Sequence, residues 1–389
     1  MKNVDWKALK PHVPLGLDDA QYVPHARSAG EEIANWVRAG RSPILVGGPA
    51  GVGKSTELAH AAQILQSDRI ACLVQLDRSE NMRRLTPDRM LLRIIQVVGR
   101  HVGDAVRGLV SVSLGNVFER VEADLNGADA THEVSAGVLL NAALREIIRI
   151  SRHGKMTLLV DGLEKVPPGN SCLDLFEALA TIDEAVDQVV IIPWHAAFGP
   201  QADTVIRLGE RFVAVRALDP DGDAAEPVRR FFFEMLARRL GWPIETLDPN
   251  AIHASFRCSV DDARSRRAEE VKVVTDAVRI CGGLPRVFLQ LLGDAGTYAK
   301  LRRSDPWPID EDFRDACEDH TDSFRRLLLP GDIDAIRTTA GTNGSELDLD
   351  RKIRLMAHGV LLERVREGVS VLDVHPLARA VLGGGGRHA

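Results

Sequence analysis

A run of glycines followed by a lysine and a serine is the strongest chemical signal in the sequence. Residues 48–55 read Gly-Pro-Ala-Gly-Val-Gly-Lys-Ser, which fits the phosphate-loop pattern G-x-x-x-x-G-K-S/T. Glycines let the chain curl around a phosphate without a Cβ in the way. The lysine can reach the β- and γ-phosphates, and the serine hydroxyl can ligate Mg²⁺. We therefore expect a nucleotide to be bound by Gly48, Pro49, Ala50, Gly51, Val52, Gly53, Lys54, Ser55 and Thr56.

The segments on either side of this loop fit the same interpretation. Residues 43–46 form an apolar run typical of a buried strand, and residues 57–65 have a helical pattern. A strand, a glycine loop and a helix N-terminus aim backbone N–H groups and the positive end of a helix dipole at one point, which suits an anion with several charged oxygens. The alternative is a glycine turn that precedes a helix by chance.

Two carboxylates after a later apolar run indicate that a bound nucleotide would be hydrolysed. Residues 156–160 predict a buried strand, and Asp161 and Glu164 follow it. In P-loop NTPases a carboxylate at the tip of a neighbouring strand holds the Mg²⁺ shell, so Asp161 joins Ser55 as a predicted metal ligand. Glu164 could orient or deprotonate the attacking water. The alternative is an ordinary strand that ends in a solvated turn, where Asp and Gly are common.

The amino-acid composition limits the classes of protein to which the chain can belong. The chain has 389 residues, enough for two or three domains, and 45% of them are hydrophobic, which supports a large core. The net charge of −6 argues against a generally basic nucleic-acid binder and leaves a local basic face open. Five scattered cysteines without a C-x-x-C pair suggest reduced thiols. With no apolar signal core and no apolar run near ~20 residues, we expect a cytoplasmic protein that does not contact a membrane.

Apolar runs alternate with helical patterns in the first half of the chain. This alternation predicts an α/β fold with a parallel sheet covered on both faces, and a nucleotide at the carboxyl ends of the strands. The predicted strands are residues 43–46, 70–77, 156–160, 188–193 and 211–216, and the predicted helices are residues 28–37, 57–65, 88–123, 138–152 and 172–179.

The second half of the chain has a different pattern. A turn-rich stretch at 218–223 precedes a helical region that residues 281–286 interrupt. Two helices (333–339 and 349–358) and two alternating strands (361–365 and 369–374) then follow in the order of a winged helix. We therefore expect a P-loop NTPase core followed by a helical lid domain and a winged-helix domain. The expected boundaries are an N-terminal segment at 1–40, the core at 41–219, the lid at 220–305, and the winged-helix-like domain with its Gly-rich tail at 306–389.

These features together resemble the STAND branch of the AAA+-like P-loop ATPases, which includes NACHT and related signalling ATPases. The resemblance covers about residues 25 to 380. Asp161-Gly162-Leu163-Glu164 is similar to the acidic motif of that family, and Gly283-Leu284-Pro285 is similar to its glycine-x-proline motif near the adenine. The resemblance implies that Pro285 contacts the nucleotide and that Arg286 acts as a sensor arginine. It also implies a switch between ATP and ADP states.

The sequence departs from the family at several positions. Lys165 stands where NACHT proteins often carry a further acid. The strand near Val190 ends in Pro193, Trp194 and His195, where relatives often place a polar residue and an arginine that sense the γ-phosphate. His195 is a candidate substitute, and the alternative is a structural histidine. Two surface arginines are candidate fingers for a neighbouring subunit, or are simply solvated: Arg207 and Arg211.

Two functions remain open at this point. The first is an ATPase, with a slow turnover, that uses ATP/ADP and Mg²⁺ as a molecular switch. It would control a separate effector or sensor protein in bacterial signalling or anti-phage defence, with a nucleotide-dependent homo-oligomer as a further possibility. The second is a DNA-associated ATPase that reads duplex DNA with its winged helix. Residues 348–354 mix acidic and basic side chains, whereas a DNA-reading helix should be basic, so the switch is favoured.

Overall fold

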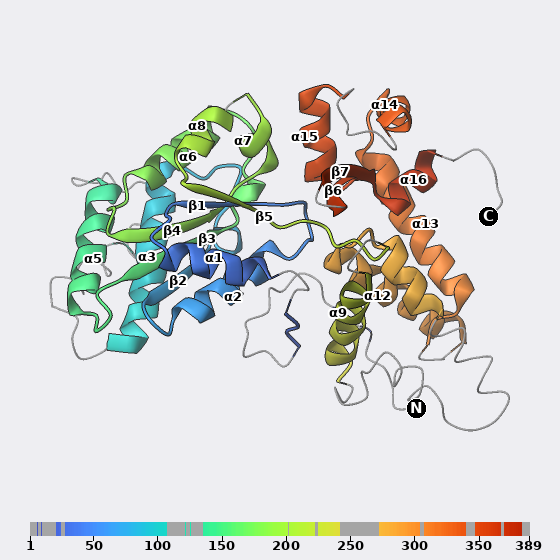
Figure 1. Ribbon diagram of the computed structural model, residues 1–389, viewed down its shortest axis with the longest axis horizontal. Helices are drawn as coiled ribbons and strands as arrows, with labels where there is room; N and C mark the ends of the chain where they lie inside the picture. The colour runs from blue at the N-terminus through green and yellow to red at the C-terminus, as the bar shows by residue number, and fades with distance from the viewer. Residues whose placement is uncertain are drawn as a thin grey trace. The chain divides into compact units, whose positions relative to one another are not determined.

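The computed structural model describes residues 6, 9, 21–24, 28–106, 121, 125, 135–200, 202–221, 225–241, 272–303, 307–339, 347–366 and 369–382 (Figure 1). The chain divides into two compact units. The sheet unit comprises Ala29–Gly47 and Glu57–Ala214, and the helical unit comprises Met1–Ser28, Gly48–Thr56 and Val215–Ala389. The predicted phosphate loop therefore clusters with the helical unit, although the strand before it belongs to the sheet unit. The expected domain boundaries stay a prediction.

Five parallel strands form the centre of the sheet unit, in the order β2-β3-β4-β1-β5. Adjacent strands are in register, so that Leu45 lies beside both Val190 and Phe212, and Gln75 lies beside Asp161. This arrangement confirms the predicted α/β fold class. The strands are β1 (Ile44–Gly47), β2 (Ile70–Gln75), β3 (Met156–Asp161), β4 (Val186–Ile191) and β5 (Arg211–Ala214).

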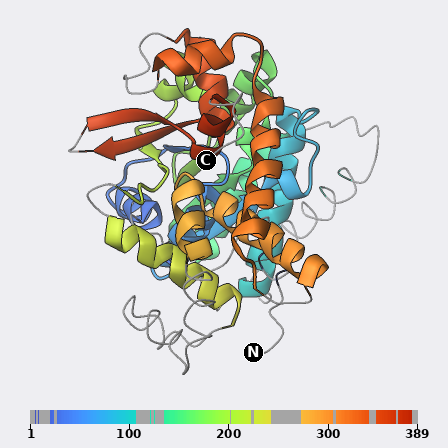
Figure 2. The same cartoon turned by 90° about the vertical axis from the view of Figure 1, so that its right-hand side faces the viewer.

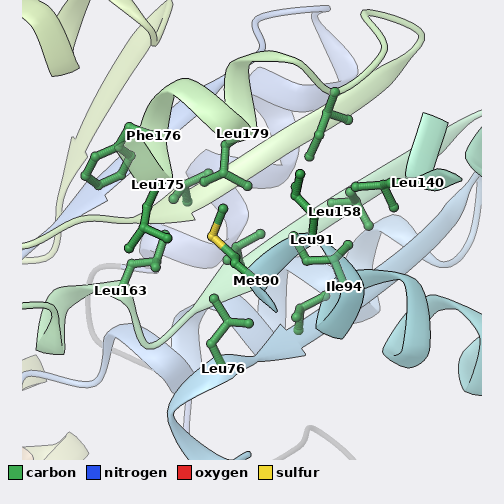
Figure 3. Packing of buried hydrophobic residues seen from close by; sticks show 14 of the residues in the cluster. Leu76, Met90, Leu91, Ile94, Leu140, Leu158, Leu163, Leu175, Phe176 and Leu179 are labelled. Atoms are coloured by element: carbon green, nitrogen blue, oxygen red, sulfur yellow. The ribbon is translucent and has the colours of Figure 1, made fainter. Parts of the chain in front are cut away.

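Helices cover the sheet through apolar faces. In Figure 3, Met90 and Ile94 of one helix pack near Leu158 of β3 and Leu175 of another helix, in a cluster of buried side chains. The spacing of Met90 and Ile94 places them on one helix face, which is why this segment is helical and buried on that side. The helices are α1 (Ala29–Arg38), α2 (Lys54–Leu65), α3 (Pro87–Val106), α5 (Ala136–Ile150), α6 (Asn170–Ala180), α7 (Trp194–Phe198) and α8 (Ala202–Arg207), with 3₁₀ turns η2 (Leu76–Arg78) and η3 (Leu163–Lys165).

Strand β4 begins and ends two residues before the predicted 188–193. The strand can include Asp187 because Arg69 donates to its carboxylate at 2.7 Å, so the charge is paired. It ends at Ile191, shortly before Pro193, which has no N–H to donate to a neighbouring strand. The predicted helix 88–123 is helical over Pro87–Val106, and most of its remainder lies outside the described residues.

The helical unit carries a winged-helix arrangement, as predicted. Helix α13 packs on both α12 and α16, and Figure 2 shows the red hairpin in which β6 pairs antiparallel with β7. No helix among the described residues is long and apolar enough to cross a membrane. The elements are α9 (Ala225–Arg239), a helical stretch at 272–280, α12 (Pro285–Arg303), α13 (Asp310–Leu327), α14 (Asp332–Thr339), α15 (Leu349–Ala357), β6 (Leu361–Arg366), β7 (Val369–Val374) and α16 (Pro376–Leu382).

Candidate nucleotide-binding site

The phosphate loop uses backbone angles that only glycine adopts readily. Gly51 has φ 83° and Gly53 has φ 106°. A Cβ added to Gly53 would meet no described atom within 4 Å, so the loop leaves open space there. A Cβ added to Gly48 would lie 2.4 Å from the carbonyl oxygen of Val215. The loop therefore has room for a ligand beside Gly53 and is tightly packed at Gly48, which fits the predicted phosphate site.

Lys54 begins α2 and places its ammonium group within the loop. The side chain is buried, and Nζ donates to the carbonyl oxygens of Gly48 at 2.9 Å and Pro49 at 3.0 Å. These bonds hold the ammonium group inside the loop that would receive the phosphates. Ser55 and Thr56, both half-buried, follow on the first turn of α2, where the backbone N–H groups and the helix dipole also favour negative charge.

The turn before α12 contacts the phosphate loop directly. The backbone N–H of Arg286 donates to the carbonyl oxygen of Gly51 at 3.2 Å, and a Cβ on Gly51 would lie 2.9 Å from the Arg286 Cβ. Pro285 is the first residue of α12, a position that needs no N–H. Gly283 has φ 78°, and a Cβ there would come within 1.7 Å of the Leu218 carbonyl oxygen. The nucleotide-binding roles of Pro285 and Arg286 stay predictions, although both residues lie at this contact.

The predicted acidic residues lie at the carboxyl end of β3. Asp161 is the last residue of the strand and is buried. Gly162 turns the chain with φ 101°, and a Cβ on it would meet the Asp77 backbone nitrogen at 2.7 Å. Lys165 forms an ion pair with Asp77. One carboxylate oxygen of Glu164 is buried and accepts no hydrogen bond from any described residue. A buried acceptor of this kind needs a donor, and a positioned water would supply one.

The end of β4 adds two polar groups at the same edge of the sheet. Strand β4 lies between β3 and β1, so its carboxyl end lies between the acidic turn and the strand that leads into the phosphate loop. Trp194 Nε1 and His195 Nε2 are buried there and, within the described ranges, form no hydrogen bond. Burial lowers the pKa of His195, so the imidazole is neutral at pH 7 and can offer one N–H but no charge. The sequence indicated His195 as a candidate but gave no role to Trp194. The only sequence feature that could have indicated Trp194 is its position next to His195.

The two candidate arginine fingers differ in their surroundings. The guanidinium of Arg211 lies over the ring of Trp36, with its carbon 4.3 Å from the ring centroid, which is a cation–π arrangement. Arg207 is exposed on α8. Both side chains are exposed, and a finger role for either residue stays a prediction.

No protein-family model matches the sequence, and no curated protein matches it either. Among solved structures, the chain is similar to a Walker-type ATPase of Pyrococcus abyssi, with 12% identity over 94% of this chain and 99% of that chain, at a TM-score of 0.52. The chain therefore shares the fold of that protein. At this identity the likeness shows the fold alone.

A second similar structure is the ORC1 protein of Aeropyrum pernix in complex with DNA, with 16% identity over 97% of this chain and 96% of that chain. Its TM-score is 0.46.

Proposed function

We propose that the protein is an ATPase of the STAND type, which binds ATP with Mg²⁺ at residues 48–56, hydrolyses it slowly, and acts as a switch on a separate partner protein. The observation that carries this proposal is the hydrogen bond between Gly51 and Arg286. This bond joins the loop that would hold the phosphates to α12, the helix that precedes α13 and the winged-helix elements. Bacterial signalling or anti-phage defence, and assembly into a homo-oligomer with ATP, are proposed on the STAND resemblance alone.

The proposed reaction divides the roles among four side chains. Lys54 would bind the β- and γ-phosphates, Ser55 and Asp161 would hold the Mg²⁺, and Glu164 would orient the attacking water. Mg²⁺ keeps several waters and takes only one or two protein ligands, so one hydroxyl and one carboxylate suffice. When bound, it supplies positive charge to the phosphate oxygens. The buried and unpartnered oxygen of Glu164 supports the last role, because a water would satisfy it.

The turn that contacts the phosphate loop also holds the winged helix. Arg364 of β6 donates to the carbonyl oxygen of Gly282 at 3.3 Å. His375, which follows β7, lies 3.1 Å from the Cys281 carbonyl oxygen through Nε2, and the Leu377 N–H donates to its Nδ1 at 3.2 Å. Burial lowers the pKa of His375 to about 3, so the ring is neutral and Nε2 carries the proton. A shift of the loop at Gly51 would thus reach both strands of the hairpin.

The segment that follows β5, at residues 218–219, is hydrogen-bonded to the same hairpin. Asp219 accepts hydrogen bonds from Arg364 at 2.7 Å and Arg366 at 2.8 Å. The neighbouring Leu218 N–H donates to the Gly283 carbonyl oxygen at 3.1 Å. The linker, the turn before α12 and the wing hairpin therefore form one bonded group beside the phosphate loop. A ligand that favours one arrangement of this group over another would shift its population.

The basic residues of α15 and of the β6–β7 hairpin argue against the DNA-associated alternative. Arg354 of α15 donates from one guanidinium nitrogen to the two carboxylate oxygens of the buried Asp332, at 2.7 and 2.6 Å. Arg351 lies 3.3 Å from the same carboxylate. The hairpin arginines are likewise held by Asp219 and Asp373. Side chains used in internal ion pairs are not available to phosphates of DNA. Among the described residues of α15, Lys352 is the basic side chain without an ion pair.

Titration calorimetry of Mg²⁺-ATP binding to the K54A and K352A variants tests the proposal. Lys54→Ala removes the charge that meets the phosphates, so binding should be lost, whereas Lys352→Ala removes a lysine from α15 and should leave the affinity unchanged. Unchanged affinity in K54A would contradict the site. Titration of a labelled DNA duplex at two salt concentrations tests the alternative, since phosphate contacts give a steep dependence on salt. A steep dependence that K352A reduces would favour the DNA-associated function.

A further inference from the structure

The N-terminal residues of the chain pack onto helix α12, although nearly 300 residues of sequence lie between them. Trp6 is 7% exposed. A Cβ added to Gly296 of α12 would lie 2.1 Å from the Trp6 Cδ2 atom and 2.4 Å from its Cγ. The indole thus occupies the space that any other residue at position 296 would fill. We call this space the Gly296 notch.

A second tryptophan packs against the Trp6 indole. The rings of Trp6 and Trp307 are perpendicular, with centroids 5.4 Å apart, which is the edge-to-face geometry that aromatic pairs prefer. Leu9, also buried, donates its N–H to the Trp6 carbonyl oxygen at 3.1 Å, and a Cβ on Gly293 would make an ordinary contact with Leu9 at 3.8 Å. Both apolar side chains of this short turn therefore lie on the same face of α12.

The same N-terminal segment is held at a second place, on helix α9. Arg238 donates to the Tyr22 carbonyl oxygen at 2.6 Å, and Arg239 donates to the Gln21 side chain at 3.1 Å. Tyr22 and Val23 are both buried. Helices α9 and α12 already touch through Phe232 and Phe288, whose ring centroids are 5.0 Å apart. Trp6 and Leu9 thus lie against α12, and Gln21 and Tyr22 are bonded to α9.

We propose that the Gly296 notch is an internal docking site for Trp6, and that this contact, which we call the clasp, holds the end of α12 that contacts the phosphate loop. The occupant is the chain's own Trp6, because the notch fits that indole and Trp307 completes it. The effect on nucleotide rests on the proposed function. Release of the clasp should loosen α12, weaken the contact between Arg286 and Gly51, and speed the departure of ADP.

Two glycine substitutions on one helix face give a matched test. Gly296→Ala places a methyl group where the Trp6 indole lies, whereas Gly293→Ala adds a methyl group at ordinary contact distance. Both changes raise the helix propensity of α12 equally, so the difference between them reports the clash alone. The full chain labelled with 5-fluorotryptophan shows docking by ¹⁹F NMR, and the Trp6 signal is assigned from its disappearance in W6A. Stopped-flow release of a fluorescent ADP measures the consequence.

We expect G293A to keep the wild-type Trp6 signal and ADP release rate. G296A should shift that signal toward solvent-exposed tryptophan, and both G296A and W6A should speed ADP release between about twofold and about tenfold, the range that corresponds to the loss of one edge-to-face pair. The double variant should be no faster than either single variant, since both remove the same docking. W6A leaves α12 unaltered, which separates release of the clasp from misfolding of the helix.

Two results would overturn the inference. An unshifted Trp6 signal in G296A would show that the notch does not hold the indole. A shifted signal with unchanged ADP release would show that the clasp does not act on the nucleotide. If the wild-type protein bound no ADP, the proposed function would fail, whereas the NMR comparison would still decide whether the segment docks.

Discussion

Replacing Asp219 by asparagine should loosen the β6–β7 hairpin from the linker that leaves the sheet. Asparagine keeps the volume of the side chain and one acceptor oxygen but removes the charge. The Asp219 side chain is 10% exposed and that of Arg364 is 6% exposed, so the substitution leaves the guanidinium of Arg364 buried with a weaker partner.

The expected size of the effect follows from the burial of each partner. Removing one member of a buried ion pair costs about 3–5 kcal/mol. Arg366 is 45% exposed, so its share is below about 1 kcal/mol. Asp373 still lies 3.7 Å from Arg364, and the amide oxygen still accepts a hydrogen bond. We therefore expect a loss of about 2–3 kcal/mol of local stability, which is roughly a 30- to 150-fold change in the opening equilibrium.

The effect of pH on the stability difference between wild type and D219N follows from the pKa of Asp219. Burial raises the pKa of Asp219, but the hydrogen bond from Arg366 and the charge of Arg364 outweigh burial and hold the pKa below its ordinary value of 3.8. A carboxylate with a lowered pKa in the folded state stabilises the fold above the unfolded value and loses this effect as the pH falls through the folded value. The difference between wild type and D219N should therefore be the same at pH 7 and pH 5.

Hydrogen exchange followed by mass spectrometry, on peptides that cover β6 and β7, measures this opening. Asp221→Asn is the matched control, because Asp221 is 60% exposed and lies 3.7 Å from its partner Arg229. We expect faster exchange in D219N and wild-type exchange in D221N. The double variant D219N/R364Q should recover part of the loss, because no charge then stays buried. Equal exchange in D219N and D221N would refute the reasoning.

Three further predictions concern the nucleotide site. Glu164→Gln should keep ATP bound and slow hydrolysis by about 100-fold or more, the usual contribution of a positioned base; equal phosphate release by wild type and E164Q would remove that role. Arg286→Ala should leave ATP binding intact but abolish any difference in small-angle scattering between the ADP state and a state with a non-hydrolysable ATP analogue; a wild-type protein with one shape in both states would itself exclude the switch. Gly51→Ala should weaken ATP binding about tenfold, because a non-glycine residue at positive φ costs about 1–2 kcal/mol and the new Cβ would lie 2.9 Å from Arg286; calorimetry showing the wild-type affinity would contradict this.

The sheet could be predicted from the sequence because its strands are short apolar runs, buried on both faces. Four helices were not predicted: α7, α8, α13 and α16. Helix α13 is mostly charged, with few buried side chains such as Phe313 and Phe324, so its apolar pattern is weak. Helices α7, α8 and α16 are at most two turns long, too short to show a helical period. Strand β4 was displaced in the prediction because Asp187 looks unsuited to a buried strand until its pairing with Arg69 is known.

Part of the candidate site could likewise be predicted from the sequence, and part could not. The phosphate loop is a local pattern, so sequence alone indicates it. The contact that joins this loop to α12 is between Gly51 and Arg286, and the contact that joins the N-terminal residues to α12 is between Trp6 and Gly296; both pairs lie far apart in the chain. Nothing near Asp219 predicts that two arginines of β6 will bind it. Side-chain pairing of this kind leaves no periodic signal in a single sequence.

The contact between Gly51 and Arg286 also sets an order of events during synthesis of the chain. At about 5–20 residues per second, a ribosome needs roughly 10 to 50 s to reach Arg286 after it has added Gly51. Over that interval the nascent phosphate loop lacks the backbone donor that later contacts it, and Trp6 lacks its notch on α12. The nucleotide site can therefore be completed only late in translation, and a ribosome that stalls before α12 would leave the phosphate loop without its contact to Arg286.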